Sequence, residues 1–281
     1  MAVEFTKMHG LGNDFVVINA VTQRVELDAA AIARMGDRHS GIGFDQLLLV
    51  ETPDDPDADF RYRIHNSDGT LAEQCGNGAR CLARFVLDRG LTVKTRLVLQ
   101  TGNDHVVCEV HGDRVEVDMG EPAFDPAMIP FDESTAATAV AEDGSVELDV
   151  EGERVRCTPV SMGNPHAVLF VDDISTAPVA TLGPAVQRHP AFPAGVNVGF
   201  CEMVDAGFVR LRVHERGAGE TRACGSGACA AIAAAIRAGR VGERVKVSLP
   251  GGKLWVSWQG PGHAIRMSGP TAVVFEGRID P

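Results

Sequence analysis

The sequence predicts an α+β protein, with β structure predominating, that consists of two pseudo-symmetric domains produced by an internal duplication. When the 281-residue chain is shifted along itself by 149 positions, the strand-like segment 61–66 (RYRIHN) falls on segment 210–215 (RLRVHE). The same shift superposes two Cys-Gly-x-Gly-Ala motifs, at Cys75 and Cys224. Each half also contains many short Val-rich segments separated by Gly, Asn and Asp, which is typical of strands and turns.

Each Cys-Gly-x-Gly-Ala motif precedes an apolar helical segment, 82–87 in the first half and 230–236 in the second. Glycine commonly follows the last turn of a helix, so we expect the two helices to end near Gly90 and Gly239, which also coincide at the 149-residue offset. Each half is therefore predicted to carry one long helix.

The ends of the two halves also match each other. Gly12-Asn13 falls on Gly163-Asn164 at an offset of 151, and Gly120 falls on Gly269 at 149. We therefore predict domains at 1–120 and 121–268, with segment 269–281 returning to the first domain. Segment 121–143 is rich in Pro, Ala, Asp and Thr and is expected to connect the halves.

Composition narrows the function classes. The net charge is −12 and no basic patch stands out, which argues against a nucleic-acid partner. No apolar run approaches the roughly 18–20 residues of a membrane span, and the N-terminus lacks a signal-peptide pattern, so we expect no membrane partner and a cytoplasmic location. Seven cysteines without a secretory signal indicate reduced thiols.

The placement of Cys75 and Cys224 at helix N-termini suggests acid–base chemistry. The helix dipole and the unpaired N–H groups there favour thiolate, so we expect both thiol pKa values to fall from about 8.5 toward neutrality. The neighbouring glycines let backbone N–H groups approach a carboxylate closely. A single such cysteine could equally be a small core residue, but its duplicated placement favours function.

The other five cysteines, Cys81, Cys108, Cys157, Cys201 and Cys229, are expected to pack in the core. No Cys-x-x-Cys pair occurs, and five residues separate Cys75 from Cys81. We therefore expect no metal site.

Several polar residues are further site candidates. Asn is common in turns, so any one of them alone is compatible with a structural role. The second half has Glu215-Arg216 where the first half has Asn66-Ser67, and this asymmetry suggests that one end of a ligand needs an ion-pairing Arg. His166 either lines the site or caps a turn. The remaining candidates are Asn13, Gln46, Asn164 and Asn197.

Three strings in the sequence resemble the signatures of the diaminopimelate epimerase family, and the likeness covers nearly the whole chain. They are residues 7–15 (KMHGLGNDF), residues 73–81 (EQCGNGARC) and residues 223–227 (ACGSG). The resemblance implies two barrels, each around a central helix, with the substrate in the cleft between them.

The resemblance also implies site residues, in two groups. Cys75 and Cys224 would be the two catalytic bases, and Gly76, Asn77, Gly225 and Ser226 would bind the carboxylate at the reacting carbon. Asn13, Asn66, Asn164, Asn197, Glu215 and Arg216 would bind the distal end of the substrate, with Gln46 beside them. The implied reaction converts L,L- to meso-diaminopimelate without a cofactor, in lysine and peptidoglycan precursor synthesis.

Three other interpretations remain open. A pyridoxal phosphate enzyme would need a Schiff-base lysine, and none of the four lysines lies beside a phosphate-binding pattern. A proline racemase relative would usually carry His after Cys-Gly, where this chain has Asn77. An inactive amino-acid-binding module would not need both cysteines. A homodimer is compatible with the sequence, which does not determine the oligomeric state.

Overall fold

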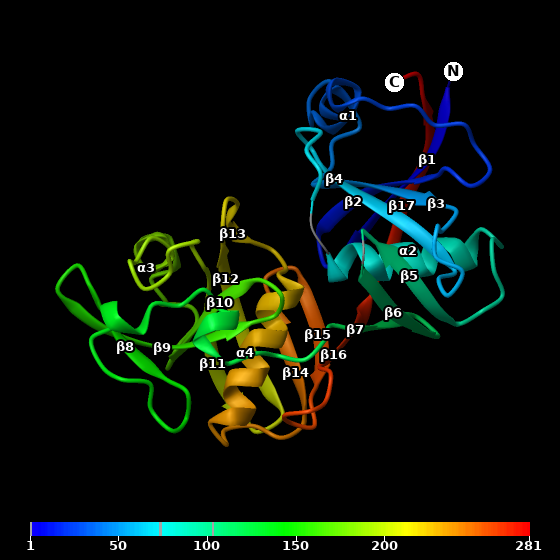
Figure 1. Ribbon diagram of the computed structural model, residues 1–281. Coiled ribbons are helices and arrows are strands. Elements are labelled where there is room, and N and C mark those ends of the chain that lie inside the picture. Colours follow the sequence, from blue (N-terminus) through cyan, green and yellow to red (C-terminus); the bar gives the residue numbers. More distant parts are fainter. Residues whose placement is uncertain (1, 73–74, 103) are drawn as a thin grey trace. The chain divides into compact units, whose positions relative to one another are not determined.

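The computed structural model describes residues 2–72, 75–102 and 104–281 and separates into two compact units (Figure 1). Unit 1 comprises Met1–Asp118 and Ser268–Pro281, and unit 2 comprises Met119–Met267. The C-terminal strand β17 (Ala272–Ile279) belongs to unit 1, where it pairs antiparallel with β1 (Val3–Gly10). The two ends of the chain therefore lie side by side in one unit.

The strands of unit 1 follow the order β17-β1-β2-β3-β4-β5-β6-β7. The β2–β3 and β4–β5 pairs are parallel, and the other pairs are antiparallel. Parallel neighbours need a crossover connection, which α1 and α2 supply here. The remaining strands are β2 (Asn13–Asn19), β3 (Gln46–Glu51), β4 (Phe60–Asn66), β5 (Arg96–Thr101), β6 (Asp104–His111) and β7 (Arg114–Asp118).

Helix α2 (Gly76–Asp88) lies against β1, β2, β3, β6 and β7, so that the sheet curls around it. Its Leu82 and Val86 are fully buried in the resulting core. The shorter helix α1 (Ala29–Gly36) begins at Asp28, whose carboxylate accepts a hydrogen bond from the N–H of Ala31 at 2.7 Å. It packs in a second core beside β1, β2 and β3.

Unit 2 repeats this plan. In the order β8-β9-β10-β11-β12-β14-β15, the β10–β11 and β12–β14 pairs are parallel and the others antiparallel, and β13 pairs with the end of β12. The strands are β8 (Val146–Val150), β9 (Glu153–Ser161), β10 (Pro165–Val171), β11 (Asn197–Asp205), β12 (Phe208–Glu215), β13 (Gly219–Thr221), β14 (Arg244–Leu249) and β15 (Gly252–Ser257). Strand β16 (Arg266–Pro270) begins in unit 2 and ends in unit 1.

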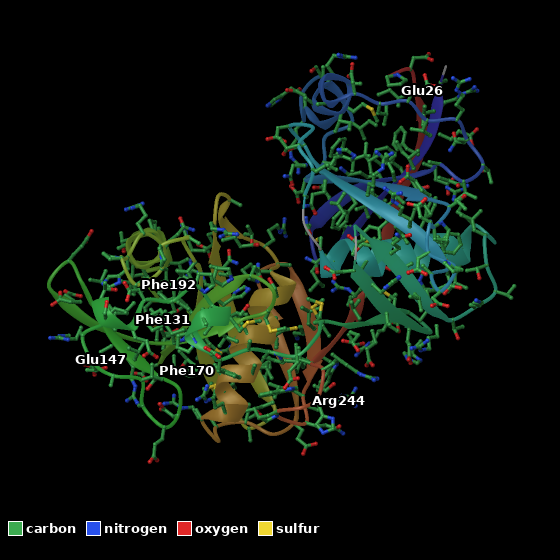
Figure 2. All side chains as sticks on the ribbon, viewed as in Figure 1. Glu26, Phe131, Glu147, Phe170, Phe192 and Arg244 are labelled. Carbon is green, nitrogen blue, oxygen red and sulfur yellow. The ribbon has the colours of Figure 1, made fainter. Side chains whose placement is uncertain are left out.

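Helix α4 (Gly225–Arg237) is the counterpart of α2 and contacts β9, β10, β11, β12 and β15. Its residues 228–235 are buried, and six of them are alanines, which let the strands approach closely on all sides. Helix α3 (Val179–Gln187) covers a separate core in which the rings of Phe131 and Phe192 lie 5.1 Å apart (Figure 2).

The predicted fold class is confirmed, because both units place one helix inside a mainly antiparallel, barrel-like sheet with matching parallel pairs. The helices end as predicted, with Gly90 and Gly239 in the left-handed region at φ 65° and 66°. Segment 121–143 holds two short 3-10 turns, η1 (Pro126–Met128) and η2 (Glu133–Thr135), and is otherwise irregular. Within the described ranges, no helix has the length and apolar character needed to cross a bilayer.

Candidate active site

Cys75 and Cys224 occupy the same structural position in the two units. Each is the N-cap of its enclosed helix, with extended backbone (φ −129°, ψ 107° and φ −105°, ψ 109°). Each sulfur accepts a hydrogen bond from the N–H three residues later, of Gly78 or Gly227, at 3.4 Å. A Cβ at Gly227 would lie 3.1 Å from the Cys224 sulfur, which is tighter than an ordinary van der Waals contact. The sequence thus places both thiols at helix N-termini, as predicted.

Three predicted site residues of unit 1 meet where adjacent strands begin or end. Asn13 begins β2, Gln46 begins β3, and Asn66 ends β4. Gln46 pairs directly with Asn66 across the sheet, and its Nε2 donates to Asn66 Oδ1 at 3.3 Å. The same register brings Gln46 opposite Phe15, two residues after Asn13. Strand register therefore gathers these amides at one rim of unit 1.

Asn13 connects that rim to the helix N-terminus. Its Oδ1 accepts a hydrogen bond from Asn77 Nδ2 at 3.2 Å and one from the Cys75 thiol at 3.8 Å. Asn77 is buried, and Gly76 is the first residue of α2. Glu73 and Gln74, which open this motif, lie outside the described residues.

The second unit assembles the equivalent rim. Asn164 lies next to the start of β10, Asn197 begins β11, and Glu215 ends β12. Asn197 Oδ1 accepts a hydrogen bond from the Arg216 backbone N–H at 2.7 Å. The exposed Arg216 guanidinium donates through Nη1 to the carbonyl of Ala194 at 2.9 Å. Register again brings together residues that are far apart in the sequence.

The environment of Cys224 corrects one expectation. Its side chain is buried, with 4% exposure. Burial raises the thiol pKa well above its ordinary value, and the negative charge of Glu215 raises it further, whereas hydrogen bonds from Gly227 and Ser226 lower it. The expectation that the helix N-terminus would lower the pKa of Cys224 toward neutrality is therefore wrong for this structure, because desolvation outweighs the dipole.

Glu215 and Ser226 are the polar side chains beside the Cys224 thiol. Ser226 Oγ lies 3.7 Å from the sulfur, and Gly225 begins α4. The Glu215 carboxylate is hydrogen-bonded to the thiol and raises its pKa. Thr221 of β13 donates its hydroxyl proton to Glu215 Oε1. The sequence analysis missed Thr221, because a threonine in a short strand carries no signal of its own.

His166 is buried, with 1% exposure, and its Nε2 lies 3.0 Å from Asn164 Oδ1. Burial and the positive charge of Arg216 lower its pKa to about 3, so the imidazole is neutral at pH 7. The side chain therefore lies inside the rim of unit 2 beside two predicted site residues.

The other cysteines are core residues, as expected. All five are fully buried, and burial raises the pKa of Cys81, Cys108, Cys157 and Cys201 to about 12. Among the residues that the structure describes, no three His, Cys, Asp or Glu side chains are grouped as a metal ion would require.

Comparison with known proteins identifies the family. The family model for diaminopimelate epimerase matches residues 5–124 and 158–274. The chain belongs to this family. It is 54% identical over 280 residues to a diaminopimelate epimerase of Pseudomonas syringae pv. tomato and 53% identical to one of Stutzerimonas stutzeri, with 99% of each chain covered. The unmatched segment, 125–157, includes most of the connection between the halves.

More distant solved structures share the fold. A hydroxyproline epimerase of Agrobacterium vitis, solved with trans-4-hydroxy-L-proline, matches with a TM-score of 0.67 at 19% identity, covering 99% of this chain and 92% of that one. A PhzF-family phenazine biosynthesis protein of Bacillus anthracis matches with a TM-score of 0.68 at 14% identity over all of both chains. At these identities the likeness shows the fold alone. The 52–54% relatives place this chain with the diaminopimelate epimerases and not with the proline racemase relatives.

The buried neutral His166 predicts a pH dependence of stability. Its pKa is 6.5 in the unfolded chain and about 3 in the folded protein, so its contribution is complete above about pH 6.5 and is lost as the pH falls toward 3. Between about pH 5.5 and 4, this group should lower the free energy of unfolding by about 1.4 kcal/mol per pH unit. Urea unfolding of wild type and His166→Gln should therefore show a shallower acid loss in the variant. Equal slopes would contradict the assignment.

Proposed function

We propose that this chain epimerises diaminopimelate between its L,L and meso forms, with one thiol from each half acting on opposite faces of a single α-carbon. The observation that carries the proposal is the pair of helix N-caps, in which Cys75 and Cys224 have the same backbone geometry and the same 3.4 Å contact to a backbone N–H. Membership of the family supplies the substrate. Each unit then supplies one of the two thiols.

In the proposed reaction, a thiolate on one face removes the α-proton, and the thiol on the other face delivers its proton to the same carbon. One C–H bond breaks and one forms, and the two sulfurs exchange protonation states. The α-proton is much less acidic than a thiol, so the developing carbanion needs stabilisation by preorganised donors. The backbone at the helix starts, around Gly76, Asn77, Gly225 and Ser226, is suited to bind the adjacent carboxylate.

Glu215 gives the second half a proton acceptor next to its thiol. Its carboxylate raises the Cys224 pKa and lies within hydrogen-bond reach of the thiol, so it is placed to accept the thiol proton. The corresponding residue of the first half is Asn66, which does not ionise. The two thiols are therefore activated in different ways.

The remaining polar residues suit the distal, unreacting end of the substrate. Amide donors and acceptors are offered by Asn13, Gln46 and Asn66 of unit 1 and by Asn164 and Asn197 of unit 2, where the neutral His166 lies beside Asn164. The planar guanidinium of Arg216 matches a carboxylate. We also propose that the enzyme works in the cytoplasm, where its seven cysteines stay reduced.

Replacing either catalytic thiol should remove activity. Cys75→Ala and Cys224→Ala should each reduce epimerisation by at least about 100- to 10,000-fold, because each face needs its own acid or base. The measurement is incorporation of deuterium at the α-carbon of L,L-diaminopimelate in deuterated water, together with appearance of the meso form. Cys75→Ser and Cys224→Ser preserve the helix cap and should also be inactive.

The matched control is Cys157→Ala, which removes a buried strand thiol of unit 2. It should retain deuterium incorporation. Normal turnover by either catalytic variant would overturn the two-base assignment, and wild type that leaves the α-carbon unlabelled would instead indicate a binding protein.

Arg216→Lys should weaken substrate binding. A lysine ammonium cannot pair bidentately with a carboxylate, so KM should rise at least about tenfold, which corresponds to about 1.4 kcal/mol. Arg210→Lys is the control, because Arg210 lies on β12 and pairs with Glu202 at 2.7 Å. An unchanged KM in Arg216→Lys would show that Arg216 is a surface residue without a role in binding.

We further propose that the chain forms a homodimer through β17. Val273, Val274 and Phe275 are consecutive in this strand and are 48%, 54% and 45% exposed. The β1–β17 register shifts here, with Lys7 opposite Phe275 and Met8 opposite Val273, so Val274 is an extra residue in a β-bulge. The three residues together form one exposed apolar stretch. A second copy of the same strand would cover this surface symmetrically.

Analytical ultracentrifugation tests the dimer. Wild type should sediment as a dimer, and Phe275→Glu should shift it toward monomer because a charge cannot be buried there without a partner. Val93→Glu changes an isolated, 95% exposed valine and should leave the dimer intact. A monomeric wild type would disprove the proposal.

A further inference from the structure

Arg80 occupies an unusual position, fully buried on the second turn of α2 in unit 1. Burying a guanidinium requires its desolvation and is costly even when hydrogen bonds compensate. The duplication supplies an internal comparison, because the 149-residue offset places Cys229 at the equivalent position of α4, where it is also fully buried. A small thiol therefore suffices to build this part of the fold, and the arginine needs another explanation.

The Arg80 side chain reaches back to the N-terminus of its helix. Its Nη2 donates to Asn77 Oδ1 at 2.7 Å. Gly10 makes room for this contact, since a Cβ at Gly10 would lie 3.0 Å from Arg80 Nη2 and 3.5 Å from Asn77 Cβ. The glycine of the first sequence signature thus packs against the second signature.

Because a guanidinium can only donate, it fixes which way the Asn77 amide faces. Asn77 Oδ1 is turned to Arg80, so its Nδ2 is presented to Asn13, where it donates to Oδ1 at 3.2 Å. The same oxygen of Asn13 accepts the hydrogen bond from the Cys75 thiol. The orientation of the Asn77 amide therefore favours the orientation of Asn13 in which Oδ1 faces Cys75.

Asp45 fixes the other end of this series of hydrogen bonds, which runs from Arg80 through Asn77 to Asn13. A carboxylate can only accept, and Asp45 Oδ2 accepts from Asn13 Nδ2 at 3.0 Å. Asp45 is itself held by Arg38 Nη2 at 2.6 Å, and Arg38 also binds Asp14, which pairs with the buried Lys7 at 2.5 Å. The Asn13 amide is therefore clamped with its oxygen toward the sulfur.

From this arrangement we propose that Arg80 and Asp45 are positioning residues for Cys75. A donor-only cation at one end and an acceptor-only anion at the other fix the amides of Asn77 and Asn13, so that Asn13 Oδ1 accepts a hydrogen bond from the Cys75 thiol. The proposal rests on the catalytic role proposed for Cys75. The second half has no matching chain at these positions, since Arg80 is replaced by Cys229 and Asn77 by Ser226.

The first test measures the reactivity of Cys75 without any substrate. Asp45→Ala removes the acceptor that holds Asn13 Nδ2, so the Asn13 oxygen is no longer clamped toward the thiol and stabilises its protonated form less. Iodoacetamide should therefore alkylate Cys75 at pH 7 about threefold faster. Peptide mass spectrometry follows Cys75 and Cys224 separately, and the Cys224 rate should not change. Tyr62 and Cys81, whose pKa values are raised by the charge of Cys75, are unchanged in these variants.

Two controls separate orientation from charge. Asp14→Asn removes a negative charge from the same cluster but keeps an oxygen that can accept from the Asp45 backbone N–H, as Asp14 Oδ1 does at 3.1 Å. The Asp14 carboxylate otherwise bonds to Lys7 and Arg38, whereas Asn13 Nδ2 donates to Asp45. The Asp14→Asn variant should change the Cys75 rate by less than Asp45→Ala does. In an Asn13→Ala background, Asp45→Ala should have no further effect, because the group through which it acts is gone. Equal rates in Asp45→Ala and wild type, or equal effects of the two aspartate variants, would overturn the proposal.

The second test measures turnover. Arg80→Met should lower kcat about 10- to 100-fold, the loss expected for one charge-assisted hydrogen bond, with KM changing less than kcat. Arg84→Met is the matched control, because Arg84 lies one turn later on α2 and bonds to the Gly112 carbonyl away from the site. If Arg80→Met does not fold, Arg80→Lys replaces it and should show a smaller loss of kcat. A folded Arg80 variant with normal kcat would overturn the role of Arg80.

These outcomes are distinguishable from failure of the proposed function. If the protein does not turn over diaminopimelate, the alkylation rates of the Asp45 variants, and of Arg80→Met measured in the same way, still decide whether Asp45 and Arg80 orient the group that faces Cys75. If it turns over diaminopimelate but the Cys75 rates are insensitive to Asp45, the two-thiol mechanism stands and the positioning role is disproved.

Discussion

The arrangement of this protein depends on one constraint, a helix N-terminus enclosed by a sheet and capped by a cysteine. The cap satisfies a backbone N–H that would otherwise lie unpaired inside the barrel. Because the sheet curls around the helix, its strand ends gather around this N-terminus, and the amides at the ends of β2, β3 and β4 follow from that closure. Unit 2 meets the same constraint with β10, β11 and β12. The cysteine sulfurs that cap the helices are thus also the atoms that carry the proposed chemistry.

The two halves place their thiols identically but surround them differently. Cys75 faces an amide oxygen whose orientation is fixed by Arg80 and Asp45 through Asn77 and Asn13. Cys224 is more deeply buried and lies beside the Glu215 carboxylate, which with desolvation raises its pKa. In the proposed reaction each thiol acts as the acid in one direction and as the base in the other, and the two do so in different surroundings.

Because the chain is duplicated, the buried guanidinium of Arg80 can be recognised as a feature that the fold itself does not require. The second half shows what the fold requires at each position, and departures from it indicate function. Cys229 shows that the helix needs only a small side chain at that point. Similarly, Asn66 and Glu215 occupy equivalent strand ends, so the carboxylate is not required by the sheet. Pairs of this kind supply, within one chain, the comparison that usually requires several proteins.

The sequence by itself determined the duplication, the α+β class, the two helix N-caps and the helix ends at Gly90 and Gly239, because these follow from local patterns and from self-similarity. The tertiary structure decided which distant residues meet. Strand register placed Gln46 opposite Asn66, and burial reversed the expected pKa shift at Cys224. The roles of Arg80, Asp45 and Thr221 also emerged from it alone. Hydrogen-bond partners and desolvation depend on neighbours that are remote in the chain, and no local pattern encodes them.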